Sequence, residues 1–545
     1  MTLPRSHIKT SACALVASLA LASLMAGCPS ESTDSCADHS APCSGGAGGA
    51  TSSTTAASMT NSSSATMTSS STGVSMDCAV SLTSGPTKGD SCGVFVDPVG
   101  GDNMQAGTMA APLKTLSAAV IAWTAGKTIY VCEGALTDTS GIVLPAGVVV
   151  YGGLDCSAGY KIKAADARTT LEPDAGEIGL RLADGQGTTE VDRLKVLATA
   201  GAAPGSSAIG VIVGEVPSVF ADVDVETGDA AAGQDSTTPT DNIGPTNSMA
   251  APIAGGVGAD ANTTTPTMTN PGGLPGTNPF CTTTGGAGGE GGKVVAVASD
   301  GIKGDDGTAT PTPPIVAGND GVGGPGDMGG GCAPGHQGSN GASVMPGPNA
   351  TLPGTISSMG YAGASGGVGE DGRPGLGGGG GGAKGLKDVT PPLADIRGAS
   401  RGGGGAGGCG GHGAPGGGAG GASIGMIVLG AAPTLSGVSF TVGKGGAGGS
   451  GAAGQFGAVG GKGGNAGSGA GTPTACDGGK GGQGSNGGAG GGGHGGHSLA
   501  IAYVTSAPAA GFTSTRAGGG LGGASDAGGK GDDGSGAETL KLPAQ

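Results

Sequence analysis

The feature that most limits how this chain can fold is a glycine at every third position over long stretches. In residues 445–465, GGAGGSGAAGQFGAVGGKGGN, glycine fills seven successive first positions of a three-residue period. The stretches 363–381 and 478–496 repeat the pattern, and shorter runs in the same phase begin at 285, 404 and 519. A hydrophobic core needs many large apolar side chains, and these stretches contain few. Any order in them therefore has to come from the backbone.

A three-residue period fits the left-handed extended helix that has three residues per turn and rises about 3.1 Å per residue. Collagen combines this helix with many prolines, whereas proline is infrequent in the three long runs. The alternative is a polyglycine II-like bundle, in which neighbouring helices pack through glycine faces and share backbone hydrogen bonds. Disorder is the remaining alternative, because ordering glycine costs more entropy than ordering any other residue. We therefore expect a polyglycine II-like bundle or disordered insertions.

The N-terminus carries the pattern of an export signal. Arg5 and Lys9 precede an apolar stretch at 11–24, and Met-Ala-Gly, which ends in two small residues, leads to Cys28. This segment resembles a bacterial lipoprotein signal with its lipobox. The resemblance implies a signal peptide at 1–27, a lipid (palmitate) anchor on Cys28, and a place in the cell envelope at the outer membrane, with surface exposure as one alternative.

Residues 28–77 are rich in serine, threonine and alanine and show no apolar period. Such a composition cannot bury enough apolar surface to fold, so we expect a flexible tether.

Cysteine usage agrees with export, because ten of the twelve cysteines remain once the signal cysteine and Cys28 are set aside. An even number in an exported chain indicates disulfides, although spacing does not give the connectivity. The simplest arrangement pairs neighbours in order, and it places Cys132 and Cys156 on adjacent strands. The ten are Cys36, Cys43, Cys78, Cys92, Cys132, Cys156, Cys281, Cys332, Cys409 and Cys476.

Half of the few aromatic residues lie between 95 and 220, which indicates a compact domain at 93–228. A strand is expected at 94–96, a helix within 112–125, and strands at 128–132, 142–144 and 148–151. The order VDPVGGDN, PLKTLSAA, GKTIYV and GVVVYGG resembles the first coil of pectin-lyase-like proteins. That resemblance implies an all-β, right-handed parallel β-helix with a short capping helix.

Internal repeats support a solenoid independently of that resemblance. The pattern Ile-Gly-apolar-x-apolar begins at 178, 209 and 424, and a poorer copy begins at 498. A spacing of about 31 residues suits one coil of a stacked fold, so the longer spacing indicates an insertion between two coils. The expected order is a parallel β-helix at 93–228, a glycine-rich insertion at 229–421, a further coil at 422–443, a glycine-triplet insertion at 444–497, a last coil at 498–513 and a glycine-rich tail at 514–545.

Two sets of polar residues are candidate sites. Aligning the strands EVDRLKV and FADVDVE places Arg193 beside Asp222 and Lys195 beside Asp224, with Glu226 nearby, on an outer face. In β-helix enzymes such residues bind calcium and abstract a proton beside a sugar carboxylate. The alternative is a charge ladder that stabilises strand stacking. Because only Ser439 follows Asp224 in the next copy, we favour the ladder.

Asp97, Asp102 and Asn103 offer oxygens that suit calcium, but these residue types also form the local bonds of turns. We favour the turn role and expect no cofactor. His494 and His497 are expected to form a surface pair, and Lys384 lacks the serine or threonine that a phosphate loop needs after its lysine.

The formal net charge of −16 disfavours nucleic acid as a partner. The expected partners are the membrane, through the lipid anchor, and polysaccharide or other surface proteins. The sequence favours a surface-anchored, non-catalytic structural or adhesive envelope lipoprotein. The alternative is a carbohydrate-binding or polysaccharide-lyase β-helix protein.

Overall fold

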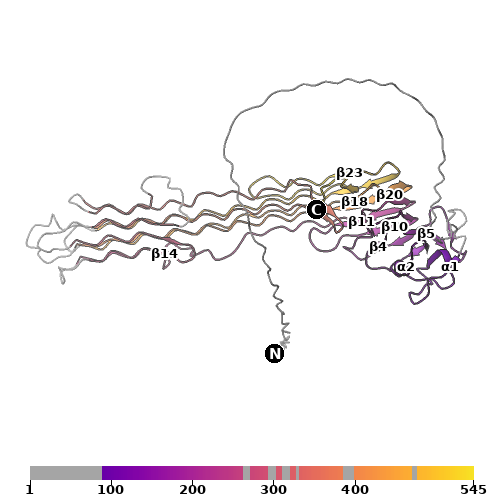
Figure 1. Ribbon diagram of the computed structural model, residues 1–545. Coiled ribbons are helices and arrows are strands. Elements are labelled where there is room, and N and C mark those ends of the chain that lie inside the picture. Colours follow the sequence, from indigo (N-terminus) through magenta and orange to yellow (C-terminus); the bar gives the residue numbers. More distant parts are fainter. Residues whose placement is uncertain are drawn as a thin grey trace, which may run out of the picture. The chain divides into compact units, whose positions relative to one another are not determined.

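The computed structural model describes residues 89–261, 270–292, 302–309, 320–326, 331–383, 398–468 and 475–545. The chain divides into a unit at 1–71 and a unit at 72–545, and the described residues all belong to the second. The signal peptide, the tether, Lys384, Cys28, Cys36, Cys43 and Cys78 lie outside the described residues. The described part is nearly all β, with three parallel sheets (Figure 1).

Two short helices lie at the start of the described part, α1 (Gly89–Cys92) and α2 (Leu116–Ala122). The side chain of Thr115 caps α2 by accepting a hydrogen bond from the N–H of Ala118 at 3.2 Å. The helix begins later than the apolar spacing suggests because Leu113 instead bridges to Val96. Since α2 contacts β1, β2 and β4, it covers one end of the apolar core.

The first parallel sheet runs β1 (Gly93–Val96), β2 (Thr128–Cys132), β5 (Val149–Asp155), β9 (Thr189–Asp192), β12 (Ser218–Ala221) and β19 (Thr434–Ser436), with β6 (Lys161–Ile162) antiparallel to β5. The second runs β3 (Gly134–Ala135), β7 (Thr169–Leu171), β10 (Leu194–Ala198), β13 (Asp224–Thr227), β20 (Val438–Val442) and β22 (Phe512–Arg516). The third runs β4 (Ile142–Leu144), β8 (Leu180–Leu182), β11 (Ala208–Val213), β18 (Ser423–Val428), β21 (Ser498–Tyr503) and β23 (Gly536–Lys541). Two short hairpins are formed by β14 (Thr277–Asn278) with β15 (Thr283–Thr284) and by β16 (Thr355–Ser357) with β17 (Gly360–Ala362).

From β4 to β20 the chain visits the three sheets in a repeating order, third, first and then second, as in β8, β9 and β10 followed by β11, β12 and β13; after β21 it passes directly to β22 in the second sheet. The repeats found in the sequence are successive strands of the third sheet. Ile209 pairs with Ile424 and Val211 pairs with Leu180, so the predicted register is confirmed across the 215-residue gap. The sheets also continue beyond residue 513, because β23 lies within the range expected to be a tail.

The core lies between the three sheets, and in it similar apolar side chains from successive strands stack on one another. Leu180, Val211 and Met426 occupy paired positions in the third sheet, and each is fully buried. Gly210 directly precedes Val211, and a Cβ there would approach a methyl carbon of Val225 in the second sheet to 2.3 Å. The same close approach between sheets, of Gly179 to Val196 and of Gly425 to Phe440, explains the glycine in the repeats that begin at 178, 209 and 424.

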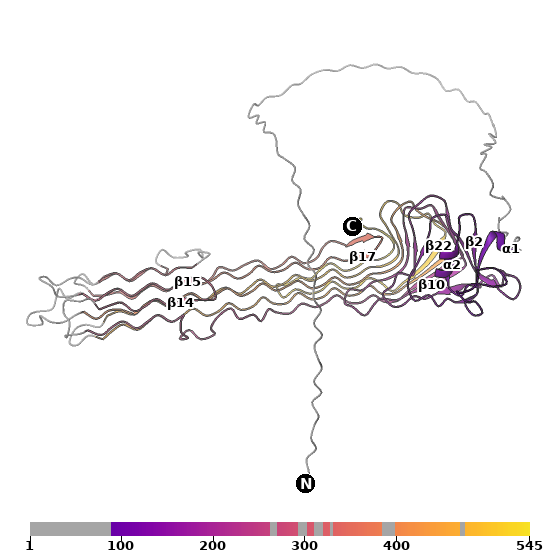
Figure 2. The same cartoon turned by 60° about the horizontal axis from the view of Figure 1, so that its bottom comes forward.

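The glycine-rich segments run side by side as extended chains away from the three sheets (Figures 1 and 2). We call these segments, described at 229–261, 270–292, 302–309, 320–326, 331–383, 398–421, 444–468, 475–497 and 517–534, the glycine bundle. The run 478–496, which we call the central run, shows how the bundle is held together. Its first-position N–H groups donate to the segment 446–464, as from Gly484 to Ala458 at 3.0 Å. Its second-position N–H groups donate to the segment 364–379, as from Gly488 to Glu370 at 2.8 Å.

The central run also accepts hydrogen bonds from two further segments. Its second-position carbonyls accept from 405–420, as from Gly411 to Ser485 at 3.0 Å. Its third-position carbonyls accept from 335–350, as from Gly338 to Lys480 at 2.9 Å. Four neighbours therefore bond most of the run's first- and second-position N–H groups and second- and third-position carbonyls without a hydrophobic core.

The disulfides follow this packing. Cys132–Cys156 joins β2 to the end of β5, as the adjacent-strand prediction required. Cys92 is also disulfide-bonded. Pairing in neighbour order is wrong for the remaining four, which form Cys281–Cys409 and Cys332–Cys476. The reason is that segments remote in sequence become neighbours within the bundle, so spacing along the chain does not decide which cysteines meet.

Candidate functional site

Two surfaces carry the polar groups that could act on a ligand. The first is the outer face of the second sheet, where Arg168, Arg193, Lys195, Asp222, Asp224 and Glu226 form what we call the charge ladder. The second is a groove in the glycine bundle.

The register predicted for the charge ladder is confirmed, because Lys195 pairs with Asp224 along β10 and β13. Arg193 Nη2 lies 3.1 Å from Asp222 Oδ2, as expected. Lys195 differs in detail, since its Nζ lies 2.8 Å from Glu226 rather than on Asp224. Asp224 instead lies 3.4 Å from the Nε of Arg168 and accepts a hydrogen bond from Ser439 at 2.5 Å. Each carboxylate of the ladder therefore has a partner within the protein.

Arg193 is held in place by its backbone and by its head group. Its guanidinium donates to the carbonyls of Ala164 and Ala165 at 3.2 and 2.9 Å. Arg193 and Asp222 have φ of 54° and 50°. Each lies where the chain turns from a strand of the first sheet into a strand of the second, the position that Gly437 occupies between β19 and β20. A base already bonded to a carboxylate and two carbonyls is poorly placed to take a proton from a substrate.

Asp192 is the buried carboxylate of this region, with only 5% of its surface exposed. Its burial raises the pKa to about 6, Arg193 opposes that shift, and Asp222 adds to it. Asp192 Oδ1 lies 3.8 Å from Arg193 Nε and has no hydrogen bond among the described residues. We find no catalytic base in this arrangement, since the carboxylate lies below the surface.

The three oxygens proposed for calcium serve the local backbone. Asp97 Oδ1 accepts from the N–H groups of Val99 and Gly100 at 3.0 Å. Asp102 accepts from Met104 at 3.0 Å, and Asn103 accepts from the residues that lead into α2. Within the described ranges no group of three or more His, Cys, Asp or Glu side chains is placed to hold a metal ion.

The expectation that His494 and His497 form a surface pair is wrong, because they are 3% and 1% exposed. Ser535 donates its N–H to His497 Nδ1 at 2.9 Å, and Nε2 lies 2.7 Å from the carbonyl of Pro353. This environment fixes the proton on Nε2, and burial lowers the pKa of His497, so the ring stays neutral. Tyr361 packs edge-on against it at 5.6 Å between centroids. The flanking glycines suggested exposure, but distant segments cover both rings.

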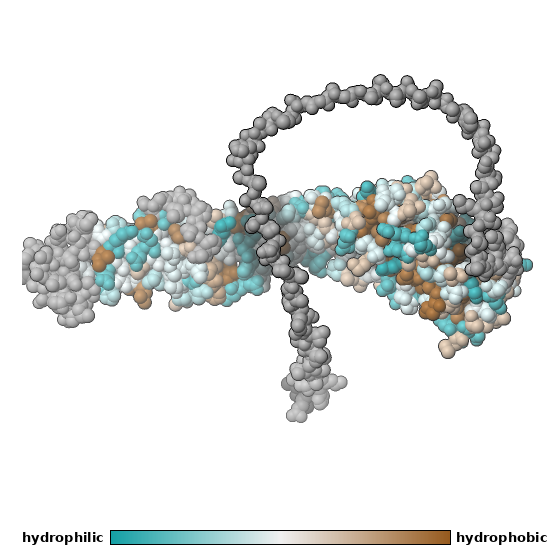
Figure 3. All heavy atoms as spheres, in the orientation of Figure 1, coloured by the Kyte–Doolittle hydropathy of each residue, from teal (hydrophilic) through white to brown (hydrophobic). Residues whose placement is uncertain are grey.

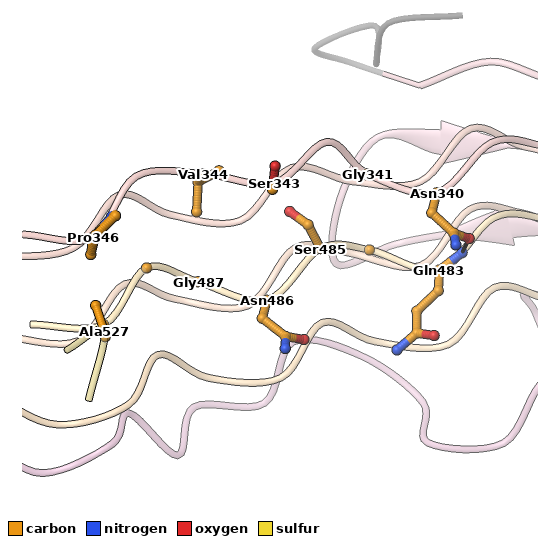
Figure 4. A pocket seen from close by; sticks show the side chains of 13 residues that line it. Asn340, Gly341, Ser343, Val344, Pro346, Gln483, Ser485, Asn486, Gly487 and Ala527 are labelled. Atoms are coloured by element: carbon orange, nitrogen blue, oxygen red, sulfur yellow. Dashed lines mark hydrogen bonds between the residues drawn. The ribbon is translucent and has the colours of Figure 1, made fainter. Parts of the chain in front are cut away.

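The groove in the glycine bundle has a volume of about 500 Å³ and lies between the segments 340–346 and 483–489, with Ala527 at one side (Figure 4). It lies at a break in the backbone bonding. Gly341 donates to Gln483 and Gly347 donates to Ala489, so the register calls for a bond from Val344 to Asn486. That bond is missing among the described residues, although the register resumes on both sides.

A second backbone bond is lost at the same level. Leu376 donates to Ser339 and Glu370 donates to Met345, so Arg373 should donate to the carbonyl of 342. Arg373 donates instead to the side chain of Ser485 at 2.8 Å. The segment around 342–344 has therefore separated from both neighbours over a single triplet.

The cause can be read in the sequence. Val344 interrupts the glycine series 335, 338, 341 and 347, and Ser485 interrupts the series 479, 482, 488 and 491. A Cβ at the flanking glycines would lie about 2 Å from a neighbouring carbonyl, as for Gly482 against Ser339 at 1.9 Å. Side chains at these two positions therefore force the segments apart. We did not identify this groove from the sequence, although the paired interruptions are a signal for it.

Most of the described surface in Figure 3 is of intermediate hydropathy, as expected for glycine, serine and alanine, and its apolar residues lie in small scattered groups. In the part of the chain that the structure describes, no helix is long and apolar enough to cross a membrane. Comparison of the chain with protein-family models, with curated proteins and with solved structures gave no match.

Proposed function

We propose that the protein is a surface-anchored, non-catalytic envelope lipoprotein with a structural or adhesive role. In this proposal the three parallel sheets are the faces of a right-handed parallel β-helix, and the glycine bundle is of the polyglycine II type. The repeating order in which the chain visits the sheets from β4 to β20 supports the first assignment. The bonding of the central run to four neighbouring segments supports the second.

The observation that carries the proposal is that the three positions of each triplet in the central run make different contacts. The N–H groups of the first and second positions bond to neighbouring segments, while third-position side chains such as Lys480 and Gln483 are exposed. A backbone-bonded scaffold that presents one side chain in three suits display and attachment. The same bundle has little that could perform chemistry.

The carbohydrate-binding alternative is favoured by the groove, whereas a lyase is disfavoured by the internal pairing of Arg193 and Lys195. A lyase of this kind would cleave an acidic polysaccharide in a calcium-dependent way and would lose that activity in Arg193→Ala and Lys195→Ala. We expect no unsaturated product, followed by its ultraviolet absorbance, from the wild-type chain with polygalacturonate and calcium. Calcium-dependent product that disappears in either variant would overturn the non-catalytic assignment.

The anchor is tested by labelling the full chain, expressed in a Gram-negative host, with radioactive palmitate. We expect label in the wild type, and we expect Cys28→Ser to lose both the label and its membrane association. Cys36→Ser is the matched control and should keep both. Antibody staining of intact cells then reports surface display. Equal labelling of wild type and Cys28→Ser would overturn the lipoprotein assignment, and staining only after lysis would overturn surface display.

A further inference from the structure

We infer that the groove between 340–346 and 483–489 is a binding site for a neutral glycan. This inference rests on the proposed adhesive function, which it makes specific by naming the surface and the chemical class of its ligand.

The groove is a built feature of the bundle rather than a simple packing fault. Where the backbone register is broken, side chains replace the lost partners: Ser485 Oγ accepts the N–H of Arg373 at 2.8 Å. The carboxylate of Glu370 likewise accepts a hydrogen bond from the N–H of Met345 at 3.2 Å. The break in the register is therefore compensated by bonds with Arg373 and Glu370, while in the described part of the chain no such bond replaces the one between Val344 and Asn486. A defined groove is left there.

The open side presents backbone groups that a ligand can satisfy. The N–H of Val344 and the carbonyl of Asn486 have no hydrogen bond among the described residues, although the flanking register pairs them. Both residues line the groove. An incoming hydroxyl can accept from the first and donate to the second, as one sugar hydroxyl or two adjacent ones would.

The side chains around these groups are amides and a hydroxyl. Asn340 and Asn486 each use Oδ1 to accept a backbone N–H, from Gln483 at 2.9 Å and from Gly457 at 3.1 Å. These bonds fix the amide planes and leave the two NH₂ groups available as donors. Ser343 is exposed on the facing segment (Figure 4). Fixed donors cost little entropy when a ligand binds.

The charge of the groove selects the class of ligand. None of the residues that line it carries a charge, while the whole chain has a formal net charge of −16. A charged ligand would leave water without gaining an ion pair, and an acidic glycan would also be repelled by the rest of the protein. Val344, Pro346 and Ala489 add C–H surface, which suits the apolar faces of sugar rings. A neutral, hydroxyl-rich ligand fits this combination.

The experiment is titration calorimetry of the folded full chain with cellotetraose, maltotetraose and chitotetraose, and with tetragalacturonate as the acidic comparison. We expect at least one neutral tetrasaccharide to bind and the acidic one not to bind. Asn340→Ala should weaken binding roughly tenfold, the loss expected for about 1.4 kcal/mol of hydrogen bonding. Asn349→Ala is the matched control, because Asn349 accepts the N–H of Gly492 at 2.8 Å in the same way but does not line the groove.

A sharper test is the double variant Val344→Gly and Ser485→Gly, which puts glycine back at the two positions where the three-residue glycine series is interrupted. We expect the lost backbone bonds to form, the groove to close and binding to disappear, while the melting temperature stays the same or rises. Loss of binding together with unchanged or higher stability excludes simple unfolding.

Three results would overturn the inference: no tetrasaccharide binds, only the acidic tetrasaccharide binds, or the double variant binds as the wild type does. These failures differ from failure of the proposed function, which the palmitate label and the staining of intact cells report without any sugar.

Discussion

At Gly454 an added Cβ would lie 2.0 Å from the carbonyl oxygen of Gly487 in the central run. The six other first-position glycines of 445–463 face the same run at similar distances, and none of the seven has a positive φ. Glycine is therefore needed here for space rather than for backbone freedom. This requirement explains why the period is kept so strictly in the long runs.

We expect Gly454→Ala to lower the free energy of unfolding by about 1–3 kcal/mol, since two backbones must move apart to admit the methyl group. The exposed neighbour Ala453 provides the control, and Ala453→Ser should change stability by less than about 0.5 kcal/mol. Thermal melts followed by circular dichroism compare the two. Equal melting temperatures would show that segment 445–463 does not pack against the central run.

Asp192 provides a pH-dependent prediction at the same scale. Its folded-state pKa of about 6 lies above the ordinary value of 3.8, so the folded protein holds this proton more tightly than the unfolded chain does. Stability should therefore fall as pH rises from about 4 to about 6, and the loss should persist above that range. We expect Asp192→Asn to stabilise the protein by roughly 1–3 kcal/mol at pH 8 and to have little effect at pH 4. The same gain at both pH values would contradict a buried, ionising carboxylate.

At the scale of elements, the strands were predictable because each carries a local pattern. The strands at 128–132 and 142–144 have the bounds that their β-branched runs predicted, and the repeats at 178, 209 and 424 stack in the expected register. The pairing of Lys195 with Glu226 was not predictable, since both neighbouring carboxylates lie within reach of a long side chain. The sequence showed the triplet period of the glycine runs, but it could not show which runs become neighbours.

That choice of neighbours is also why the pairing Cys332–Cys476 was missed. The bond joins two segments 144 residues apart in the sequence, next to the start of the central run. We expect the double variant Cys332→Ser and Cys476→Ser to lose about 2–4 kcal/mol of stability. Amide exchange should quicken at Gly479 and Gly482 and stay unchanged in β18. Uniform quickening throughout the sheets would mean that this disulfide holds the whole unit rather than one end of the bundle.

At the scale of the unit 72–545, the glycine insertions leave the stacked sheets and return to them in register. The strands β11 and β18 pair directly although a bundle segment separates them in the sequence, and β18 and β21 do the same. The proposed β-helix therefore fixes where each glycine segment starts and ends. The groove depends on that alignment, because a shift of one residue would remove Val344 from the level of Ser485.

The central claim is that backbone bonds between glycine runs order the bundle, and amide hydrogen exchange of the central run tests it most directly. We predict a three-residue period of protection, with slow exchange at first and second positions such as Gly484 and Gly488, whose N–H groups bond to neighbouring segments. Lys480, Asn486 and Ala489 at third positions have no such backbone bond in the described structure and should exchange faster. Exchange at the rate of an unfolded chain at all of these positions would contradict the account.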